Sequence, residues 1–327
     1  MKLGTLKWPD RRDGQLAVFD RNLKHLVEVR EWGGTLQAVL DNWQQAALDL
    51  MRIYDSLNKD SSIGRPFDWP ELAAPLPRAY QWLDGSAYLS HVERVRKARG
   101  VSIPPSFLED PLIYQGGSDN FLGAQDPIVV KNESWGIDFE AEVAVITDDV
   151  PMGISSDETA EHIRLVVLVN DVSLRNLIPA ELLKGFGFLH GKPSSSFSPV
   201  AVTPDELGDA WDGTRLHGPL QVFWNGDRFG YPDAGVDMQF DFAKLISHAA
   251  KTRRLQAGTI IGGGTVSNRD RSKGYSCIAE KRGVEVIDKR EATTPFMRFG
   301  DRVRIEMIDA QDQSIFGAID QLVESCP

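Results

Sequence analysis

Two glutamates placed two residues apart, Glu140 and Glu142, are the clearest sign of chemistry in this chain of 327 residues. They lie in the apolar stretch 137–146, which is typical of a β-strand, and side chains on a strand alternate between its two faces. Both carboxylates should therefore point to one side, where burial is costly unless a positive charge compensates them. A hard divalent cation with oxygen ligands would do so. The alternative is an edge strand whose glutamates face water.

Further candidate groups follow at a strand end and in a loop, where functional residues concentrate. The apolar strand 165–170 runs into Asp171, which is either a metal ligand or the N-cap of a following helical turn. In such a turn Arg175, four residues on, would lie over Asp171 as a local ion pair. Lys192 lies in a polar loop, where a lysine is most often simply solvated.

A helix is predicted from residue 81 to about residue 99, with Asp84, Tyr88 and His91 on one face. An imidazole and a carboxylate on one helix face can serve acid–base chemistry or metal binding. Alternatively, Asp84 is only an N-cap and His91 only packs. A capping box beginning at Ser90 would start the helix later.

The segment 260–267 is a predicted strand that runs into a glycine-rich loop. It lacks the Gly-Lys-Ser/Thr of a P-loop and the G-x-G-x-x-G spacing of dinucleotide sites. Either the loop is a tight turn, or its backbone N–H groups bind a substrate carboxylate or oxyanion. Together, these segments supply four carboxylates, one imidazole and two cations to a single predicted domain.

The composition excludes several classes of function. The formal net charge of −11 argues against nucleic-acid and anionic-membrane partners, because both favour basic surfaces. The two cysteines form no C-x-x-C pair and no thiolate metal pattern. No secretory signal and no apolar run of transmembrane length is recognisable. We therefore expect a cytoplasmic protein.

The elements that must position these residues are mostly short strands. A small β-unit over residues 1–30 and a helix over 35–57 precede a Pro-rich connector, which predicts a domain of residues 1–75 and a larger one of 76–327. The pattern favours a mostly β (α+β) fold over a doubly wound sheet. In the larger domain we predict helices near 155–164 and 240–255 and strands near 128–130, 139–146, 165–170, 219–224, 259–262, 284–287, 303–308 and 314–319.

The order of these motifs resembles the fumarylacetoacetate hydrolase family over roughly residues 78–320. The residues that carry the resemblance are Asp84-x6-His91, Tyr114 in PLIYQG, Glu140-x-Glu142, Asn170-Asp171-x3-Arg175, Lys192, Gly264-Thr265 and Glu280. The resemblance implies a small N-terminal SH3-like unit, a C-terminal mixed β-sandwich roll and a homodimer. It also implies Mg²⁺ or Ca²⁺, with Mn²⁺ as a further option, held by Asp84, Glu140, Glu142 and Asp171.

The chain departs from the family's pattern at positions that would face the substrate. Ser86 stands where the animal enzyme has a tyrosine, and the segment Tyr114-Gln115-Gly116-Gly117 lacks its arginine. Ile178 and Pro179 replace substrate-facing glutamines. These changes leave the predicted metal ligands in place. They alter positions that would contact the substrate, so the substrate can differ from that of the animal enzyme.

The resemblance implies a metal-dependent hydrolase that cleaves the C–C bond of a small anionic β-diketone acid. The expected reaction converts fumarylacetoacetate to fumarate and acetoacetate, as in tyrosine-type aromatic catabolism. His91, oriented by Glu280, would act as general base on water, and Lys192 and Arg175 would stabilise the oxyanion. Tyr88, Tyr114, Gly264 and Thr265 would bind the substrate. The alternatives are an acylpyruvate hydrolase, decarboxylase or hydratase of the same superfamily, and a non-enzymatic β-domain that binds Ca²⁺ structurally.

Overall fold

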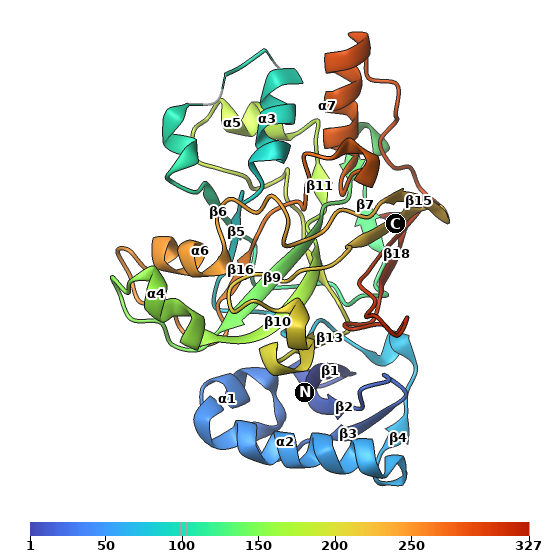
Figure 1. Cartoon of the computed structure of the whole chain (residues 1–327). Helices are drawn as coiled ribbons and strands as arrows, with labels where there is room; N and C mark the ends of the chain where they lie inside the picture. Colours follow the sequence, from blue (N-terminus) through green and yellow to red (C-terminus); the bar gives the residue numbers. More distant parts are fainter. Residues whose placement is uncertain (99, 103, 327) are drawn as a thin grey trace.

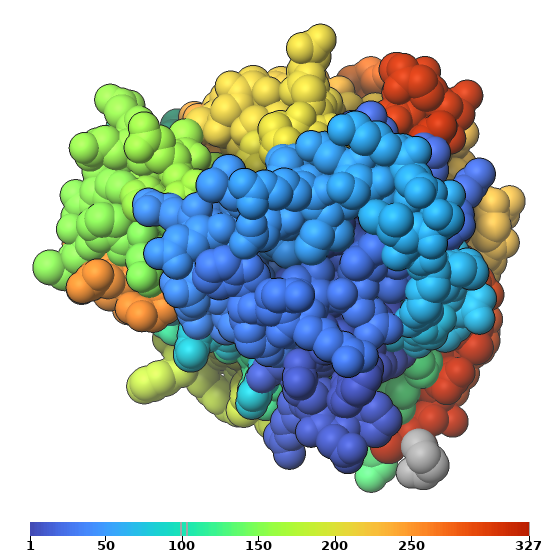
Figure 2. Space-filling model, turned by 90° about the horizontal axis from the view of Figure 1, so that it is seen from below, coloured from blue at the N-terminus to red at the C-terminus, as the bar shows by residue number. Residues whose placement is uncertain are grey.

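The computed structural model describes residues 1–98, 100–102 and 104–326 and is built on mixed sheets flanked by helices (Figure 1). This architecture confirms the predicted α+β fold class. The N-terminal segment, coloured blue, occupies one end of the molecule, and it covers most of the face in Figure 2. Among the described helices, none combines the length and the apolar character that a membrane span requires.

The largest sheet contains eleven strands among the described residues. The N-terminal strands extend this sheet, because β1 pairs antiparallel with β13. In sheet order the strands are β4 (Arg65–Pro66), β3 (His25–Glu28), β2 (Arg11–Phe19), β1 (Lys2–Trp8), β13 (Val200–Val202), β10 (Ile163–Asn170), β9 (Ala141–Thr147), β16 (Ile260–Gly262), β5 (Trp82–Gly85) and β6 (Ile113–Gly116), with β12 (Ser196–Phe197) beside β10.

Four neighbouring strands of this sheet, in the order β10, β9, β16 and β5, bring candidate ligands to one end of it. β9 pairs antiparallel with β10, with Glu142 opposite Val169. β16 pairs parallel with β5, which places Gly262 opposite Asp84, and the same glycine lies opposite Ala144 of β9. The end of β5, the start of β9 and the residue that follows β10 therefore meet.

Two smaller sheets complete the β framework of the described chain. One pairs β11 (Ser173–Leu174) with β8 (Ile137–Asp138). The other has the order β15 (Asp227–Gly230), β14 (Gln221–Trp224), β17 (Arg302–Glu306), β18 (Ile319–Ser325) and β7 (Ile128–Val130).

The helices lie along the margins of the sheets (Figure 1). Thr35 begins the first of them as predicted, because its hydroxyl accepts a hydrogen bond from the N–H of Ala38 at 3.2 Å. α3 packs against α7, and α4 packs against α6. The helices are α1 (Leu36–Leu40), α2 (Trp43–Lys59), α3 (Leu89–Ala98), α4 (Ser156–Thr159), α5 (Ile178–Leu182), α6 (Phe242–Ala249) and α7 (Ile278–Lys289).

Strand β9 is buried on both faces. Ala144 packs in one hydrophobic cluster, while Val143 and Val145 pack in a second. Glu140 and Glu142 are only 5% and 0% exposed, respectively. The edge-strand alternative, in which these glutamates face water, is therefore wrong.

Four predicted elements differ from the structure. The helix predicted over residues 35–57 is divided into α1, which ends at Leu40, and α2, which begins at Trp43. Residues 82–85 form β5 instead of a helix, because they pair with β16 and β6. The helix begins later, at Leu89, and its predicted end at Arg99 lies outside the described residues. The predicted strand 284–287 is part of α7, in which Ile278, Gly283 and Val284 are buried. The last strand begins at Ile319 and not near residue 314.

Candidate active site

Three carboxylates meet where β5, β9 and β10 end. Asp84 is the third residue of β5, Glu142 is the second of β9, and Asp171 follows the last residue of β10. One oxygen of each lies within 4.8 Å of one oxygen of both others, and all three residues are buried. The local sequence allowed both Asp84 and Asp171 to be helix N-caps. Neither residue has that role in this geometry, because each lies at the end of a strand.

The charge of this cluster is poorly compensated by the protein. Oδ1 of Asp84 and both carboxylate oxygens of Glu142 find no hydrogen-bond donor among the described residues. Burial, reinforced by the charge of Asp171, raises the pKa of Asp84 well above its ordinary value, and burial together with Asp84 does the same to the pKa of Glu142. Crowded, unpaired buried oxygens of this kind fit a hard divalent cation.

Glu140 lies beside this cluster and has its own partners. Arg175 donates from Nη2 to Oε1 of Glu140 at 2.6 Å and from Nε to Oδ2 of Asp138 at 2.8 Å. Lys192 donates to Oε2 of Glu140 at 2.5 Å. Burial opposes ionisation of Glu140, but Arg175 and Lys192 outweigh it and lower its pKa. Arg175 therefore pairs with Glu140 and Asp138, and the predicted local pair with Asp171 is wrong.

Lys192 is a buried cation and not the solvated side chain common in polar loops. Its ammonium group bonds to both Glu140 and Asp171. Asp171 also accepts from the hydroxyl of Tyr114 at 2.7 Å and from that of Ser195 at 2.6 Å. Burial disfavours the charged lysine, but Asp171 and Glu140 overcome this and raise its pKa.

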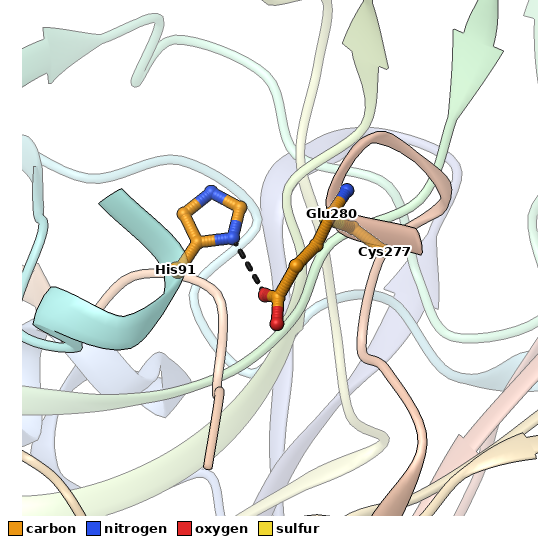
Figure 3. A group of neighbouring side chains, drawn as sticks. All are labelled: His91, Cys277 and Glu280. Carbon is orange, nitrogen blue, oxygen red and sulfur yellow. Dashed lines mark hydrogen bonds and ion pairs between the residues drawn. The ribbon is translucent and has the colours of Figure 1, made fainter. Parts of the chain in front are cut away.

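His91 of α3 faces Glu280 of α7 (Figure 3). Nδ1 of His91 lies 2.8 Å from Oε2 of Glu280, while the other ring nitrogen points away from this carboxylate. Oε1 of Glu280 accepts from Arg94 at 2.5 Å and from Ser267 at 2.9 Å. Burial would raise the pKa of Glu280, but the bonds and charges of His91 and Arg94 lower it. An ionised carboxylate only accepts, so the Nδ1 proton is fixed in place.

Cys277 is the third residue of this group in Figure 3. Its Sγ caps α7 by accepting from the N–H of Glu280 at 3.3 Å. Burial raises the pKa of the Cys277 thiol well above its ordinary value. Arg94 already balances the negative charge of Glu280, so this group of three residues does not require a metal ion. We therefore assign Cys277 the role of capping α7.

A pocket of about 180 Å³ joins the carboxylates to the imidazole. Ten of the twelve predicted site residues line it, while Asp171 and Glu280 lie behind the lining and contact Lys192 and His91, respectively. The ten are Asp84, Tyr88, His91, Tyr114, Glu140, Glu142, Arg175, Lys192, Gly264 and Thr265.

The glycine-rich loop closes one side of the pocket. Gly264 has a φ of +79°, and a Cβ there would meet the carbonyl oxygen of Gly85 at 2.3 Å. The position therefore requires glycine. Tyr88 presents its ring to the pocket, since its hydroxyl already donates to the carbonyl of Ala234 at 2.5 Å.

Sequence reasoning missed several contributors. Arg94 follows His91 by three residues, so helical spacing could have paired it with the same partner. Asp138 precedes Glu140 by two residues, but nothing local reveals that it binds Arg175. The apolar lining residues Leu182 and Phe188 lie in a segment without a recognisable motif.

Sequence profiles identify the family to which this site belongs. Residues 81–323 match the fumarylacetoacetate hydrolase C-terminal domain, and residues 1–78 match the fumarylacetoacetase N-terminal domain 2. The chain therefore belongs to the fumarylacetoacetate hydrolase family, as the motif order indicated.

Individual relatives are distant and differ in activity. The chain is 29% identical over 204 residues to a 2,4-didehydro-3-deoxy-L-rhamnonate hydrolase of Sphingomonas sp. (strain SKA58), covering 59% of this chain and 68% of the relative. It is 27% identical over 205 residues to a mitochondrial oxaloacetate tautomerase of Xenopus laevis, covering 61% and 55%. The alignment thus spans little more than half of the second relative. Both names denote enzymes, of two reaction types.

A solved structure shares the fold over the whole chain. This is the maleylpyruvate hydrolase of Sphingobium sp. SYK-6 in complex with manganese(II) and pyruvate, with a TM-score of 0.63, 15% sequence identity and full coverage of both chains. At this identity the likeness concerns the fold alone.

Proposed function

We propose that this chain is a metal-dependent hydrolase that cleaves the C–C bond of a β-diketone acid. The observation that supports it best is the pairing of His91 with Glu280 at the pocket that holds Asp84 and Glu142. An acid–base group beside a cluster of unpaired carboxylates suits hydrolysis of a substrate that chelates a metal ion.

Asp84, Glu142 and Asp171 would hold the divalent ion, with Glu140 as the predicted fourth ligand. When bound, such an ion supplies a Lewis acid that polarises the diketone and stabilises enolate charge. The manganese named with the Sphingobium neighbour supports a divalent ion of this kind, and Mg²⁺ and Ca²⁺ remain the ions predicted from sequence.

His91 would move the protons of the reaction. Its free ring nitrogen takes a proton from water, and the resulting hydroxide adds to the acyl carbonyl carbon. Collapse of the tetrahedral intermediate breaks the adjacent C–C bond, and the carbon that leaves takes the proton back from His91. One water is consumed, and the products are a carboxylic acid and a keto acid. Glu280 keeps the imidazole oriented throughout.

The two cations would have different tasks. Lys192 lines the pocket and is the predicted group for stabilising the oxyanion. Nε and Nη2 of Arg175 donate to Asp138 and Glu140, respectively, so we assign Arg175 to holding Glu140 in place. The loop at Gly264 and Thr265 would receive a substrate carboxylate.

The experiment that tests this function follows the ultraviolet absorbance of diketo acids with Mn²⁺, with Mg²⁺ and with EDTA. The substrates are acylpyruvates and fumarylacetoacetate, the substrate expected from sequence. We expect metal-dependent loss of absorbance and two identified products. Intact substrate after incubation with folded, metal-loaded protein would refute the hydrolase. The homodimer and the cytoplasmic location remain predictions.

A tautomerase is the second candidate. The named activity of the Xenopus relative supports it, and His91 with Glu280 could equally move a proton between carbon and oxygen. Keto–enol conversion of oxaloacetate without cleavage products, followed by proton NMR, would favour this reaction over hydrolysis.

A further inference from the structure

We propose that the site selects diketo acids whose acyl arm is apolar over acids that carry a second carboxylate at the end of that arm. This inference rests on the proposed function and narrows its substrate. It derives from how charge and apolar surface are distributed around the pocket.

One segment supplies an apolar wall to the pocket. Ile178 and Leu182 lie at the two ends of α5, and Phe188 follows in the loop beyond it. The ring of Phe188 packs edge-on against that of Tyr114, with 5.4 Å between their centroids. The wall therefore stands next to the tyrosine that bonds to Asp171, within reach of a substrate held at the carboxylate cluster.

The wall is held in place from behind by Glu181. Its Oε1 accepts hydrogen bonds from the N–H groups of Leu189 at 3.1 Å and His190 at 2.7 Å, and its Oε2 accepts from Gly191 at 2.9 Å. These bonds fix the backbone directly after Phe188 and directly before Lys192. A preformed wall can discriminate between substrates without first being ordered.

Among the described residues that line this pocket, a second substrate carboxylate would find no free cation. Among the described lining residues, Arg175 and Lys192 are the side chains with a permanent positive charge, and both are paired with buried carboxylates. Burying a carboxylate without a partner is costly, whereas each buried CH₂ group favours binding by up to about fourfold.

The test compares kcat/KM of the Mn²⁺-loaded full chain on substrate pairs of equal length. Each pair is an alkanoylpyruvate and its ω-carboxylate analogue, and fumarylpyruvate and fumarylacetoacetate are included. We expect the alkyl member to be preferred by about tenfold or more. Equal or faster turnover of the ω-carboxylate member would overturn the proposal.

A variant that adds a positive charge to the apolar wall tests whether the wall causes the substrate preference. Leu182→Arg places a cation at the wall and should reduce the preference for the alkyl member by about tenfold. Leu183→Arg is the matched control, because Leu183 is 90% exposed and lies outside the pocket lining. An equal change of preference in both variants would assign the effect to bulk charge and overturn the role of the wall.

Measurements of binding test this inference independently of the proposed hydrolase activity. Dissociation constants of matched alkyl and ω-carboxylate 2-oxo acids are measured by calorimetry on the same Mn²⁺-loaded protein. Tighter binding of the alkyl acids without any turnover would support the apolar wall and refute the hydrolase. Absence of both turnover and alkyl preference would refute both.

Discussion

At the scale of single residues, Glu280 connects the imidazole to the rest of the protein. One of its oxygens faces His91, and the other is bound by Arg94 and Ser267. Arg94 also donates to the backbone carbonyl of Asn268 at 2.7 Å, so the carboxylate has a fixed position. This arrangement places the proton of a neutral imidazole on Nδ1 of His91, so that its other nitrogen is the one that can accept a proton.

A double-mutant cycle tests whether Glu280 acts through His91. We expect His91→Ala to lower kcat by about 10²–10⁴. Glu280→Gln should lower it by about 10–10², because the imidazole loses its carboxylate partner but remains in the site. The double variant should be no worse than His91→Ala, since two residues that act as a unit are not additive. The measurement is kcat of all four proteins in Mn²⁺.

Folding must be checked in the same cycle, because Glu280→Gln also leaves Arg94 with an unpaired buried charge. Circular dichroism and metal-induced thermal shifts serve as the control. If the losses of kcat in the two single variants add in the folded double variant, His91 and Glu280 do not act as a unit. Glu280 would then have a role that is independent of His91.

At the scale of elements, the loop after β16 determines the shape of the pocket. Gly264→Ala combines a left-handed backbone with a contact of 2.3 Å to the carbonyl oxygen of Gly85. We expect a loss of stability of more than about 3 kcal/mol and a loss of kcat/KM of at least about tenfold. Urea unfolding and steady-state kinetics measure the two effects.

Gly153→Ala is the matched control for this substitution. Gly153 has a similar φ of +76°, but none of the described residues contacts an added Cβ there within 4 Å. It should cost only about 1–2 kcal/mol of backbone strain and leave kcat/KM unchanged. Equal effects of the two substitutions would show that strain alone, and not the close approach to Gly85, explains the requirement for glycine.

The sequence predicts elements well where local periodicity and burial agree. Alternation along β9 correctly separates Ala144 from Val143 and Val145, which pack in different hydrophobic clusters, and Glu140 and Glu142 both line the pocket. Residues 82–85 were misassigned because Asp84 and His91 have helical spacing, while the pairing of β5 with β16 joins residues nearly 180 positions apart. Tertiary pairing of this kind overrides local propensity.

The sequence predicted which residues form the site where those residues belong to a motif, but it did not predict all of the contacts between them. All twelve predicted residues are brought together around the pocket, but the partners of Arg175 were not foreseen. Its spacing of four from Asp171 indicated a local pair, whereas its partner Asp138 ends β8 and its partner Glu140 directly precedes β9. Single-sequence reasoning has no means of ranking such distant partners.

At the scale of the whole molecule, the carboxylate cluster should make stability depend on metal and on pH. Because the pKa values of Asp84 and Glu142 are raised above 3.8 and 4.5, the folded chain binds more protons there than the unfolded chain. Metal-free protein should therefore lose stability as pH rises above about 4. Mn²⁺ at 100 times its dissociation constant should restore about 2.7 kcal/mol at neutral pH.

Urea unfolding at pH 5 and pH 8, with EDTA and with Mn²⁺, measures this effect. Glu142→Gln is the informative variant, because it removes one of the mutually repelling charges. It should make the metal-free protein more stable at pH 8 and weaken the response to Mn²⁺. An unchanged response to Mn²⁺ in this variant would exclude Glu142 as a ligand.

Lys2 joins the first strand to the C-terminal part of the chain and provides a second pH-dependent contribution, and it does not line the pocket. Its ammonium group donates to the carbonyl of Ser314 at 3.2 Å, and burial lowers its pKa from 10.5 to about 8. Below pH 8 the folded protein must bury a charge that the unfolded chain exposes to water. Between about pH 8 and 10.5 the unfolded chain binds more protons, so this contribution to stability rises with pH.

Lys2→Met keeps the apolar stem and removes the charge. We expect it to stabilise the protein by about 1–3 kcal/mol at pH 7, after the loss of one hydrogen bond, and to lose this advantage as pH approaches 10.5. Urea unfolding of both proteins between pH 7 and 10.5 measures the difference, and titrations common to both cancel in it. A difference that does not change with pH would mean that Lys2 is charged in the folded protein throughout, and that the buried end of β1 is more accessible to water than its 3% exposure indicates.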